Sequence, residues 1–238
     1  MSVRDQHRAE QREEQRFEFF LAASHQLKTP VAIIQWCLQS ALERGELSVK
    51  DGELIRKAAL QADSMGALIT DMLHVLRLED HQRQSGFERV MIAPLIQGIY
   101  TQYAVPASER GISLVVEPIT TKLAVLADPT FLKQAIINLV DNAIKYTKPN
   151  GSVSITATAT AEMVKIMVVD EGIGIGEAEQ AQLFREFFRG QEAKTVAHEG
   201  TGLGLVLVKH ITESFHGHVE VASQLGKGSE FSLVLPSA

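Results

Sequence analysis

Apolar residues in the first third of the chain recur at alternating intervals of three and four positions, the spacing of a helical bundle. The pattern holds in two stretches, the first made of Phe17, Phe20, Ser24, Leu27, Val31, Ile34, Leu38 and Ala41, and the second of Ile55, Ala58, Ala62, Met65, Ile69, Met72 and Leu76. Gly45 can end the first helix and Ser48 can cap the second. Residues 17–79 are therefore predicted to form an all-α helical hairpin.

The apolar pattern of the hairpin predicts a homodimer. Two helices alone bury only one face each, and the second stretch carries a further apolar strip of Ala59, Gly66 and Leu73. A homodimer would bury this strip in a four-helix bundle. The alternative is a monomeric hairpin packed on the domain that follows. The charged residues 1–16 are interpreted as a helical extension.

The hydrophobic pattern changes after a polar linker at residues 80–86, and residues 87–238 read as a second domain. Strands are predicted at 87–92, 112–116, 123–126, 153–159, 164–169, 218–222 and 230–235, and helices at 94–107, 129–146 and 202–215. Asp128 followed by Pro129 is a strong helix start. Residues 176–199 read as a polar loop with a short Phe-rich segment. The pattern predicts an α+β sandwich with a mixed sheet and helices on one face.

Composition excludes several classes of protein. The net charge of −6 argues against non-specific nucleic-acid binding, which requires neutralisation of phosphates. A single cysteine, Cys37, excludes an internal disulfide framework and fits a reducing cytoplasm. No apolar run reaches the ~18 residues that a membrane span needs, and the start lacks a signal peptide. We expect a cytoplasmic fragment without membrane contact, whose longer parent could carry a membrane-anchored sensor region before it.

Polar residues at helical spacing mark the first candidate binding segment. Asn138, Asn142 and Lys145 stand at i, i+4 and i+7 in the predicted helix 129–146, so they share one face. Amide oxygens can ligate Mg²⁺, and a lysine can meet phosphate oxygens. The alternative is an ordinary helix with outward polar residues. Asparagine is a mediocre helix former, so two at this spacing favour a function.

Two glycine-rich segments follow. Asp170-Glu171-Gly172-Ile173-Gly174 comes after a predicted strand, where a carboxylate can accept from an adenine amine and glycines let backbone approach the base. Gly200-Thr201-Gly202-Leu203-Gly204 opens a helix, whose free N–H groups favour phosphate. Neither segment is a P-loop or a dinucleotide fingerprint, because no Gly-Lys-Ser/Thr and no early βαβ unit is present.

A histidine in the first hairpin is the candidate nucleophile. Among the eight histidines, His25 adjoins the apolar seam at Ser24; Thr29 follows one helical turn later, and Pro30 comes next. Its ordinary pKa of ~6.5 leaves a neutral ring near pH 7. His74 and His198 lack such a setting and are interpreted as surface residues.

These motifs, in this order and over nearly the whole chain, resemble the cytoplasmic catalytic core of a two-component sensor histidine kinase, with its Bergerat-type ATP site. The resemblance implies Mg²⁺ at Asn142 with support from Asn138, and phosphates at Lys145 and Tyr146. It implies adenine at Asp170, Gly172 and Gly174, an ATP lid at 176–199 with Arg189 facing the terminal phosphates, and a second glycine box of Gly200, Thr201, Gly202, Leu203 and Gly204. His25 would be the phospho-acceptor, with Thr29 orienting water when the partner is dephosphorylated.

Two positions bear on the reaction. Hydrolysing members of the superfamily carry a glutamate where this chain has Asn138, and an amide cannot act as a general base for water. Gln26 replaces the acidic residue that often follows the acceptor, so autophosphorylation of His25 is expected to be slower or to need another base. The expected function is ATP-dependent autophosphorylation and transfer to an aspartate of a response regulator. A phosphatase towards that regulator and a non-catalytic nucleotide-binding scaffold stay open.

Overall fold

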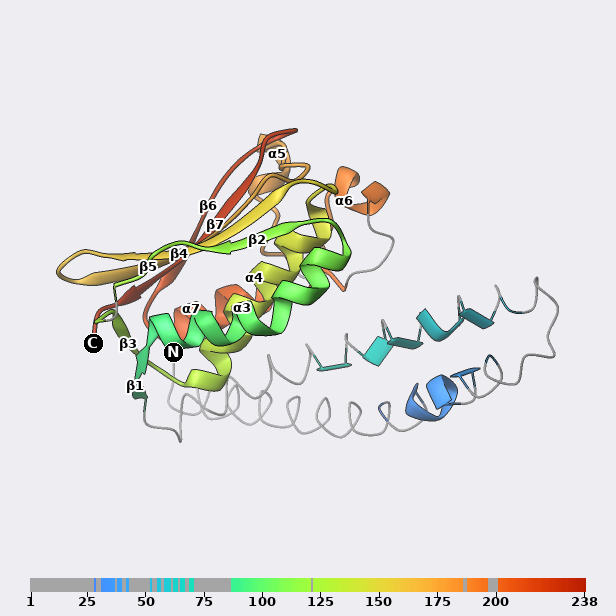
Figure 1. Cartoon of the computed structure of the whole chain (residues 1–238), viewed down its shortest axis with the longest axis horizontal. Coiled ribbons are helices and arrows are strands. Elements are labelled where there is room, and N and C mark those ends of the chain that lie inside the picture. Colours follow the sequence, from blue (N-terminus) through green and yellow to red (C-terminus); the bar gives the residue numbers. More distant parts are fainter. Residues whose placement is uncertain are drawn as a thin grey trace, which may run out of the picture. The chain divides into compact units, whose positions relative to one another are not determined.

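The computed structural model describes residues 28, 31–36, 38–39, 42, 52, 55–56, 58–60, 62–63, 65–66, 69–70, 87–120, 122–185, 188–196 and 201–238. The chain divides into two compact units, residues 1–80 and residues 81–238 (Figure 1).

The first unit is helical. Every described residue between 28 and 70 has helical backbone. Val31 from the first stretch is buried with Ala62 and Ile69 from the second, which confirms that the two stretches pack along the predicted seam. The side-chain amide of Gln35 also donates to the carboxylate of Asp63. The seam positions 17, 20, 24 and 27 lie outside the described residues.

The second unit is built on a mixed sheet of five strands in the order β2-β4-β5-β7-β6. The elements are β1 (Glu88–Met91), α3 (Ile92–Glu109), β2 (Ser113–Val116), β3 (Ala124–Ala127), α4 (Pro129–Tyr146), β4 (Ser152–Ala159), β5 (Met163–Asp170), α5 (Glu177–Gln180), α6 (Gln191–Val196), α7 (Gly204–Ser214), β6 (His218–Gln224) and β7 (Gly228–Pro236). β2 runs parallel to β4, whereas the β4–β5, β5–β7 and β6–β7 pairs are antiparallel. β1 and β3 form a separate antiparallel ribbon.

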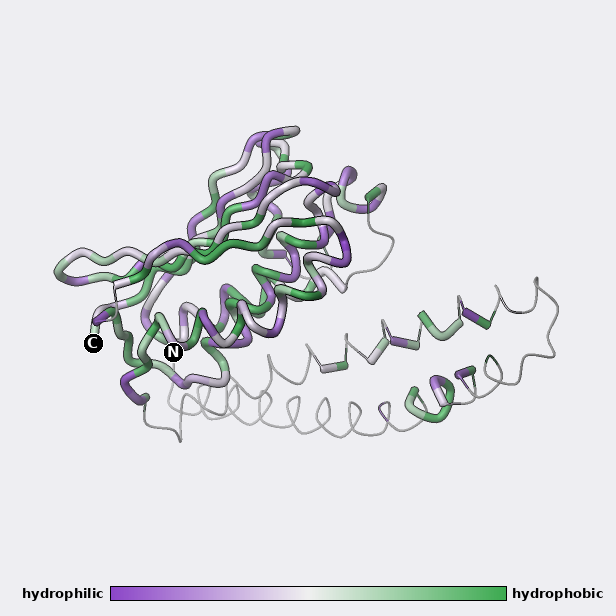
Figure 2. Tube along the Cα trace, viewed as in Figure 1, coloured by the Kyte–Doolittle hydropathy of each residue, from purple (hydrophilic) through white to green (hydrophobic). Residues whose placement is uncertain are grey.

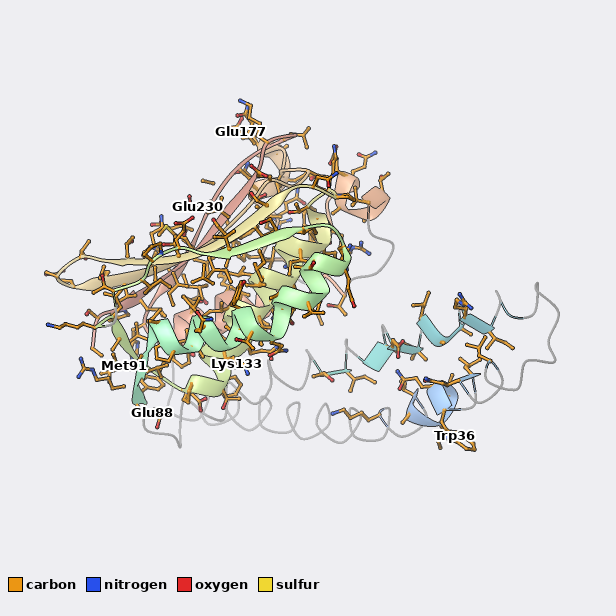
Figure 3. All side chains as sticks on the ribbon, viewed as in Figure 1. Trp36, Glu88, Met91, Lys133, Glu177 and Glu230 are labelled. Atoms are coloured by element: carbon orange, nitrogen blue, oxygen red, sulfur yellow. The ribbon has the colours of Figure 1, made fainter. Side chains whose placement is uncertain are left out.

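Helices α3, α4 and α7 lie together on one face of the sheet, as predicted (Figure 1). Hydrophobic and hydrophilic residues alternate along the strands (Figure 2), and in β5 it is Val164, Ile166 and Val168 that are buried. Ile136 and Leu207 meet this layer from α4 and α7 and are fully buried. Side chains fill the space between sheet and helices, whereas Glu177 stands at the outer end of α5 (Figure 3). The predicted α+β sandwich is confirmed.

The prediction for residues 176–199 was wrong in part, because two short helices lie within this segment. α5 begins after Gly176 and has Glu177 and Glu179 in its first turn, where acidic side chains favour a helix start. The carboxylate of Glu179 then accepts from the backbone N–H of Gln191 at the start of α6, 2.9 Å away. Helices of four and six residues are too short to show a hydrophobic period.

No helix among the residues that the structure describes is both long enough and apolar enough to cross a membrane.

The predicted cap at the start of α4, Asp128, can be tested by mutation. The Asp128 side chain accepts from the N–H groups of Thr130 at 2.8 Å and Phe131 at 3.3 Å. We expect Asp128→Ala to lower the free energy of opening α4 by about 1 kcal/mol, because these donors lose their acceptor. Native-state hydrogen exchange of the α4 amides measures this. Asp128→Asn keeps a capping oxygen and should stay near the wild type; an equal loss in both variants would contradict the capping role.

Candidate active site

Helix α4 presents one polar stripe on an otherwise buried surface. Asn138, Asn142 and Lys145 are half-buried, whereas the intervening Leu139 and Ala143 are buried against the core. The stripe therefore follows from the 3.6-residue helical period: the apolar residues fix α4 on the sheet and turn the polar residues together to the other side. Lys145 lies in the last turn, where its charge is favourable, and its Nζ is 5.9 Å from the centre of the Tyr146 ring.

The second glycine box lies directly beside this stripe. The side-chain amide of Asn138 donates to the carbonyl oxygen of Gly204 at 3.4 Å, and its own oxygen accepts from Gln134 at 3.2 Å. Gly202 has a φ of +71°, a left-handed conformation that keeps it out of α7, so the helix begins at Gly204 and not at the predicted residue 202. The Asn138 side chain thus links Gln134 to Gly204 at the start of α7.

The backbone before α7 is folded into a compact turn. The N–H of Leu203 donates to the hydroxyl of Thr201 at 3.2 Å, and the Leu203 side chain is buried. The buried leucine anchors the turn, while the first N–H groups of α7 have no carbonyl of their own helix to pair with. Such N–H groups can donate hydrogen bonds to a bound anion.

The first glycine box closes the other end of the stripe. Asp170 ends β5, and the loop that follows lies against the carboxyl end of α4: Ile173 N–H donates to the Tyr146 carbonyl at 3.2 Å, and Gly172 forms a bridge with Thr147. A Cβ on residue 172 would lie 2.7 Å from the Tyr146 carbonyl oxygen, so this approach needs glycine.

Asp170 is a buried carboxylate in this structure, with 7% of its surface exposed. Burial raises its pKa from 3.8 to about 6, against the opposing effect of the N–H groups of Gly172 and Ser229, which donate to it. Its side-chain oxygen is 2.8 Å from the Gly172 nitrogen. Above a pH of about 6 this side chain is an ionised carboxylate, which can accept a hydrogen bond from a ligand with an exocyclic amine.

Two residues at the start of β7, Gly228 and Ser229, lie against Asp170 and were not predicted from the sequence. Ser229 pairs with Asp170 across β5 and β7, and Gly228 has a φ of +99°. A Cβ on residue 228 would lie 1.9 Å from the Asp170 carbonyl oxygen. The Gly226-Lys227-Gly228 turn was the available signal, but its pairing with Asp170 depends on strand order, which the local sequence does not contain.

Arg189 lies in the segment between the two glycine boxes. Its side chain is half-buried, and its Nη2 donates to the Ala193 carbonyl of α6 at 3.4 Å. Gly190 is packed so closely on Glu179 that a Cβ there would lie 2.5 Å from a carboxylate oxygen. The segment is thus folded on itself through α5 and α6.

Mg²⁺ would have to be held largely by groups other than acidic side chains. Among the described residues, no three His, Cys, Asp or Glu side chains gather in a way that could hold a metal ion. Asn138 and Asn142 supply amide oxygens on one helix face. Mg²⁺ commonly takes one or two protein oxygens together with water and phosphate oxygens, so the donor set fits Mg²⁺ bound with a nucleotide.

The structure therefore brings most of the predicted ATP-binding residues to one corner of the second unit: the α4 stripe, the Asp170 loop and residues 201–204. His25, Gln26, Thr29 and Gly200 lie outside the described residues. Their roles, and the ligand contacts of the residues named above, stay predictions.

Comparisons with known proteins agree with the division of the chain into two units. Residues 15–81 match the family described as "His Kinase A (phospho-acceptor) domain", and residues 127–238 match "Histidine kinase-, DNA gyrase B-, and HSP90-like ATPase". The sensor-like histidine kinase SenX3 of Mycobacterium tuberculosis is 32% identical over 99% of this chain. The chain belongs to the sensor histidine kinase family. The predicted family, fold class and enzyme class are thereby confirmed.

Other relatives of this histidine kinase support the same assignment. The sensor protein SrrB of Staphylococcus aureus is 29% identical over 99% of the chain. The chain spans 57% of the length of SenX3 and 40% of the length of SrrB. Among solved structures, full-length ShkA in complex with AMPPNP has a TM-score of 0.71 and 28% identity to this chain. The match covers 93% of this chain and 46% of the ShkA chain. The catalytic domain of the histidine kinase ThkA matches 63% of this chain and 97% of its own, with a TM-score of 0.56 and 29% identity.

The raised pKa of Asp170 predicts how stability depends on pH. The folded protein holds this proton more tightly than the unfolded chain, so the contribution is fully present below about pH 4 and is lost as pH rises through about 6. We expect Asp170→Asn, which cannot ionise, to gain unfolding free energy relative to wild type between pH 4 and pH 7.5, by up to about 3 kcal/mol.

Urea unfolding at a series of pH values measures that difference. Glu177→Gln, on an exposed acid, is the control and should show no comparable trend. A constant difference between Asp170→Asn and wild type across the pH range would contradict the raised pKa.

Proposed function

We propose that this chain binds ATP with Mg²⁺, transfers the γ-phosphoryl group to its own His25, and passes it to an aspartate of a response regulator. One observation carries the ATP site: the Asn138 amide reaches Gly204, while the Asp170 loop rests on Tyr146 at the other end of the same helix. A buried acceptor, Asp170, and the backbone donors at the start of α7 thus both lie beside the polar stripe of α4.

Each group in the site has a proposed task. Asp170 accepts from the adenine amine, and Gly172 and Gly174 leave room for the base. Lys145 and Tyr146 contact the phosphates, together with the backbone of Gly200, Thr201, Gly202, Leu203 and Gly204. Asn142, supported by Asn138, supplies oxygen to Mg²⁺, whose chemistry here is to neutralise phosphate charge. Arg189 exchanges its bond to Ala193 for the terminal phosphates.

The acceptor step is a displacement at phosphorus. A neutral imidazole nitrogen of His25 forms the new P–N bond as the bond from γ-phosphorus to the bridging oxygen breaks, and ADP leaves. The ring then loses the proton from its other nitrogen. Gln26 can accept a hydrogen bond from the ring but brings no negative charge, so the proton passes to solvent or another base. In a separate reaction, dephosphorylation of the regulator by water, Thr29 orients the attacking water and phosphate leaves.

Water is a poor competitor for the phosphoryl group in this site. A hydrolase needs a general base near the metal, and Asn138 offers only an amide. Both ends of that amide are used in hydrogen bonds, to Gln134 and Gly204. This favours transfer to a histidine over hydrolysis.

We further propose a homodimer through the helical unit. Ile34 and Met65 occupy seam positions but are 47% and 45% exposed in one copy. Apolar seam residues left in water favour a second hairpin, and the match to a phospho-acceptor family supports the same arrangement. The regulator, through its receiver domain, would dock along the helices below His25.

Two other functions use the same site. A core that acts mainly as a phosphatase would dephosphorylate the regulator faster than it labels itself. A non-catalytic scaffold would bind nucleotide without labelling. Incubation with γ-labelled ATP, followed by a test for an acid-labile and base-stable label, separates the kinase from the scaffold.

His25→Ala should abolish labelling while ATP affinity stays within about twofold, because acceptor and pocket lie in separate units and the loss is confined to the chemical step. Scintillation counting measures the label and calorimetry the affinity. His74→Ala, on the same hairpin, is the matched control and should label normally. Labelling that survives in His25→Ala would assign the acceptor role to another residue.

The pKa of Asp170 predicts a second dependence. A protonated Asp170 accepts from adenine less strongly, so ATP affinity should fall as pH drops through about 6. The control ligand is purine riboside triphosphate, which carries the same phosphates without the amine. The ratio of the two affinities should be roughly tenfold or more at pH 7.5, as for a hydrogen bond to a charged group, and shrink at pH 5.5. A ratio that does not change with pH would remove Asp170 from adenine recognition.

A further inference from the structure

The side chain of Ser223 lies at the centre of a group of hydrogen bonds behind the Asp170 loop. Ser223 is near the end of β6, and its hydroxyl oxygen accepts from the Ile175 N–H at 2.8 Å. The hydroxyl is also 2.9 Å from the Gly228 carbonyl and 2.9 Å from the Ser229 hydroxyl. One side chain therefore links the residue after Gly174 to the strand residue that pairs with Asp170.

Gln180 holds the same loop at the carbonyl oxygen of Ile175. It is the last residue of α5, and its Nε2 donates to the Ile175 carbonyl at 3.0 Å and to the Ser223 carbonyl at 3.0 Å. A side-chain amide has two N–H groups, so both bonds form at once. Ile175 thus has its N–H bound by Ser223 and its carbonyl bound by Gln180.

The loop held in this way has little room to shift. Gly174 has a φ of +65°, and a Cβ on it would lie 2.0 Å from the Gln224 carbonyl oxygen. The Gly226 N–H donates to the Ile173 carbonyl at 2.7 Å. Glycine-rich backbone has many accessible conformations by itself. The Gln180 and Ser223 bonds therefore select one of them.

The neighbouring glutamine provides a contrast. Gln182 is two residues further along, and its Nε2 donates at 3.4 Å to the Ala178 carbonyl, within its own segment. The two glutamines thus differ in whether they reach the Asp170 loop and β6. A general effect of a glutamine in this segment can therefore be separated from the effect of the bonds to Ile175 and Ser223.

We propose that Gln180 and Ser223 are positioning residues for the nucleotide: they hold the Asp170 loop in its binding geometry before the nucleotide arrives and so join the start of the lid to the adenine end of the site. This inference rests on the proposed ATP-binding function. A loop that spends part of its time in other geometries binds with an affinity reduced by that fraction.

The test compares Gln180→Ala, Ser223→Ala and Gln182→Ala in the full chain. Affinities for ATP, ADP and adenosine are measured by calorimetry or competition. Both Gln180→Ala and Ser223→Ala should weaken all three ligands by about the same factor, roughly tenfold, the loss expected from one or two hydrogen bonds. Gln182→Ala should bind like the wild type. In labelling assays Gln180→Ala should raise KM for ATP with little change in kcat, because the phosphate end is intact.

Several outcomes would overturn the inference. Equal affinities in Gln180→Ala and Gln182→Ala would do so, as would a loss for ATP that spares adenosine, which would assign Gln180 to the phosphate end. If Ser223→Ala fails to fold, Gln180→Glu decides: it keeps the size of the side chain but cannot donate, and it should weaken adenosine as Gln180→Ala does. Ser223→Thr, which keeps the hydroxyl, should restore binding. A wild-type chain that binds no ATP would instead contradict the proposed function.

Discussion

The contact between the carboxyl end of α4 and the loop after β5 is the constraint on which the site depends. Two backbone interactions make it: the Ile173 N–H to the Tyr146 carbonyl, and the bridge between Thr147 and Gly172. Because Asn142 is on α4 and Asp170 precedes the loop, this contact fixes the spacing between the metal-binding and adenine ends of the proposed site. The core of α4 and β5 then keeps both ends rigid, since closely packed interiors resist small displacements.

Burying the Asp170 carboxylate costs free energy, and the packing of the fold does not require an ionisable side chain at this position. Its carboxylate is buried, and the donors that the structure gives it are the N–H groups of Gly172 and Ser229. Those two bonds offset part of the desolvation, yet the pKa still rises, so burial outweighs them. A neutral side chain would fill the same space with less penalty. A ligand that donates to Asp170 would complete the compensation, which is the physical reason to place adenine there.

The sequence predicted elements whose signals are local. Asp128 followed by Pro129 located the start of α4 at the residue where it is observed, because capping and the fixed φ of proline act within one turn. The strands β4 and β5 followed from their strand-like composition at residues 153–159 and 164–169. The helices α5 and α6 escaped prediction, since their stability comes from contacts such as Glu179 to Gln191. The bonds from Gln180 to Ser223 and from Ile175 to Ser223 were equally invisible, because they join residues 43 and 48 positions apart.

Asn138 shows how one side chain can serve both architecture and chemistry. Its amide donates to the Gly204 carbonyl and accepts from Gln134, so it connects α4 to the second glycine box. A glutamate at this position would face the Gly204 carbonyl with a second acceptor and lose that connection. The amide therefore suits a site in which the glycine box must be held in place, while the same choice leaves water without a base. In the proposed mechanism, the group that holds the second glycine box is also the group that leaves the γ-phosphoryl group available for a histidine.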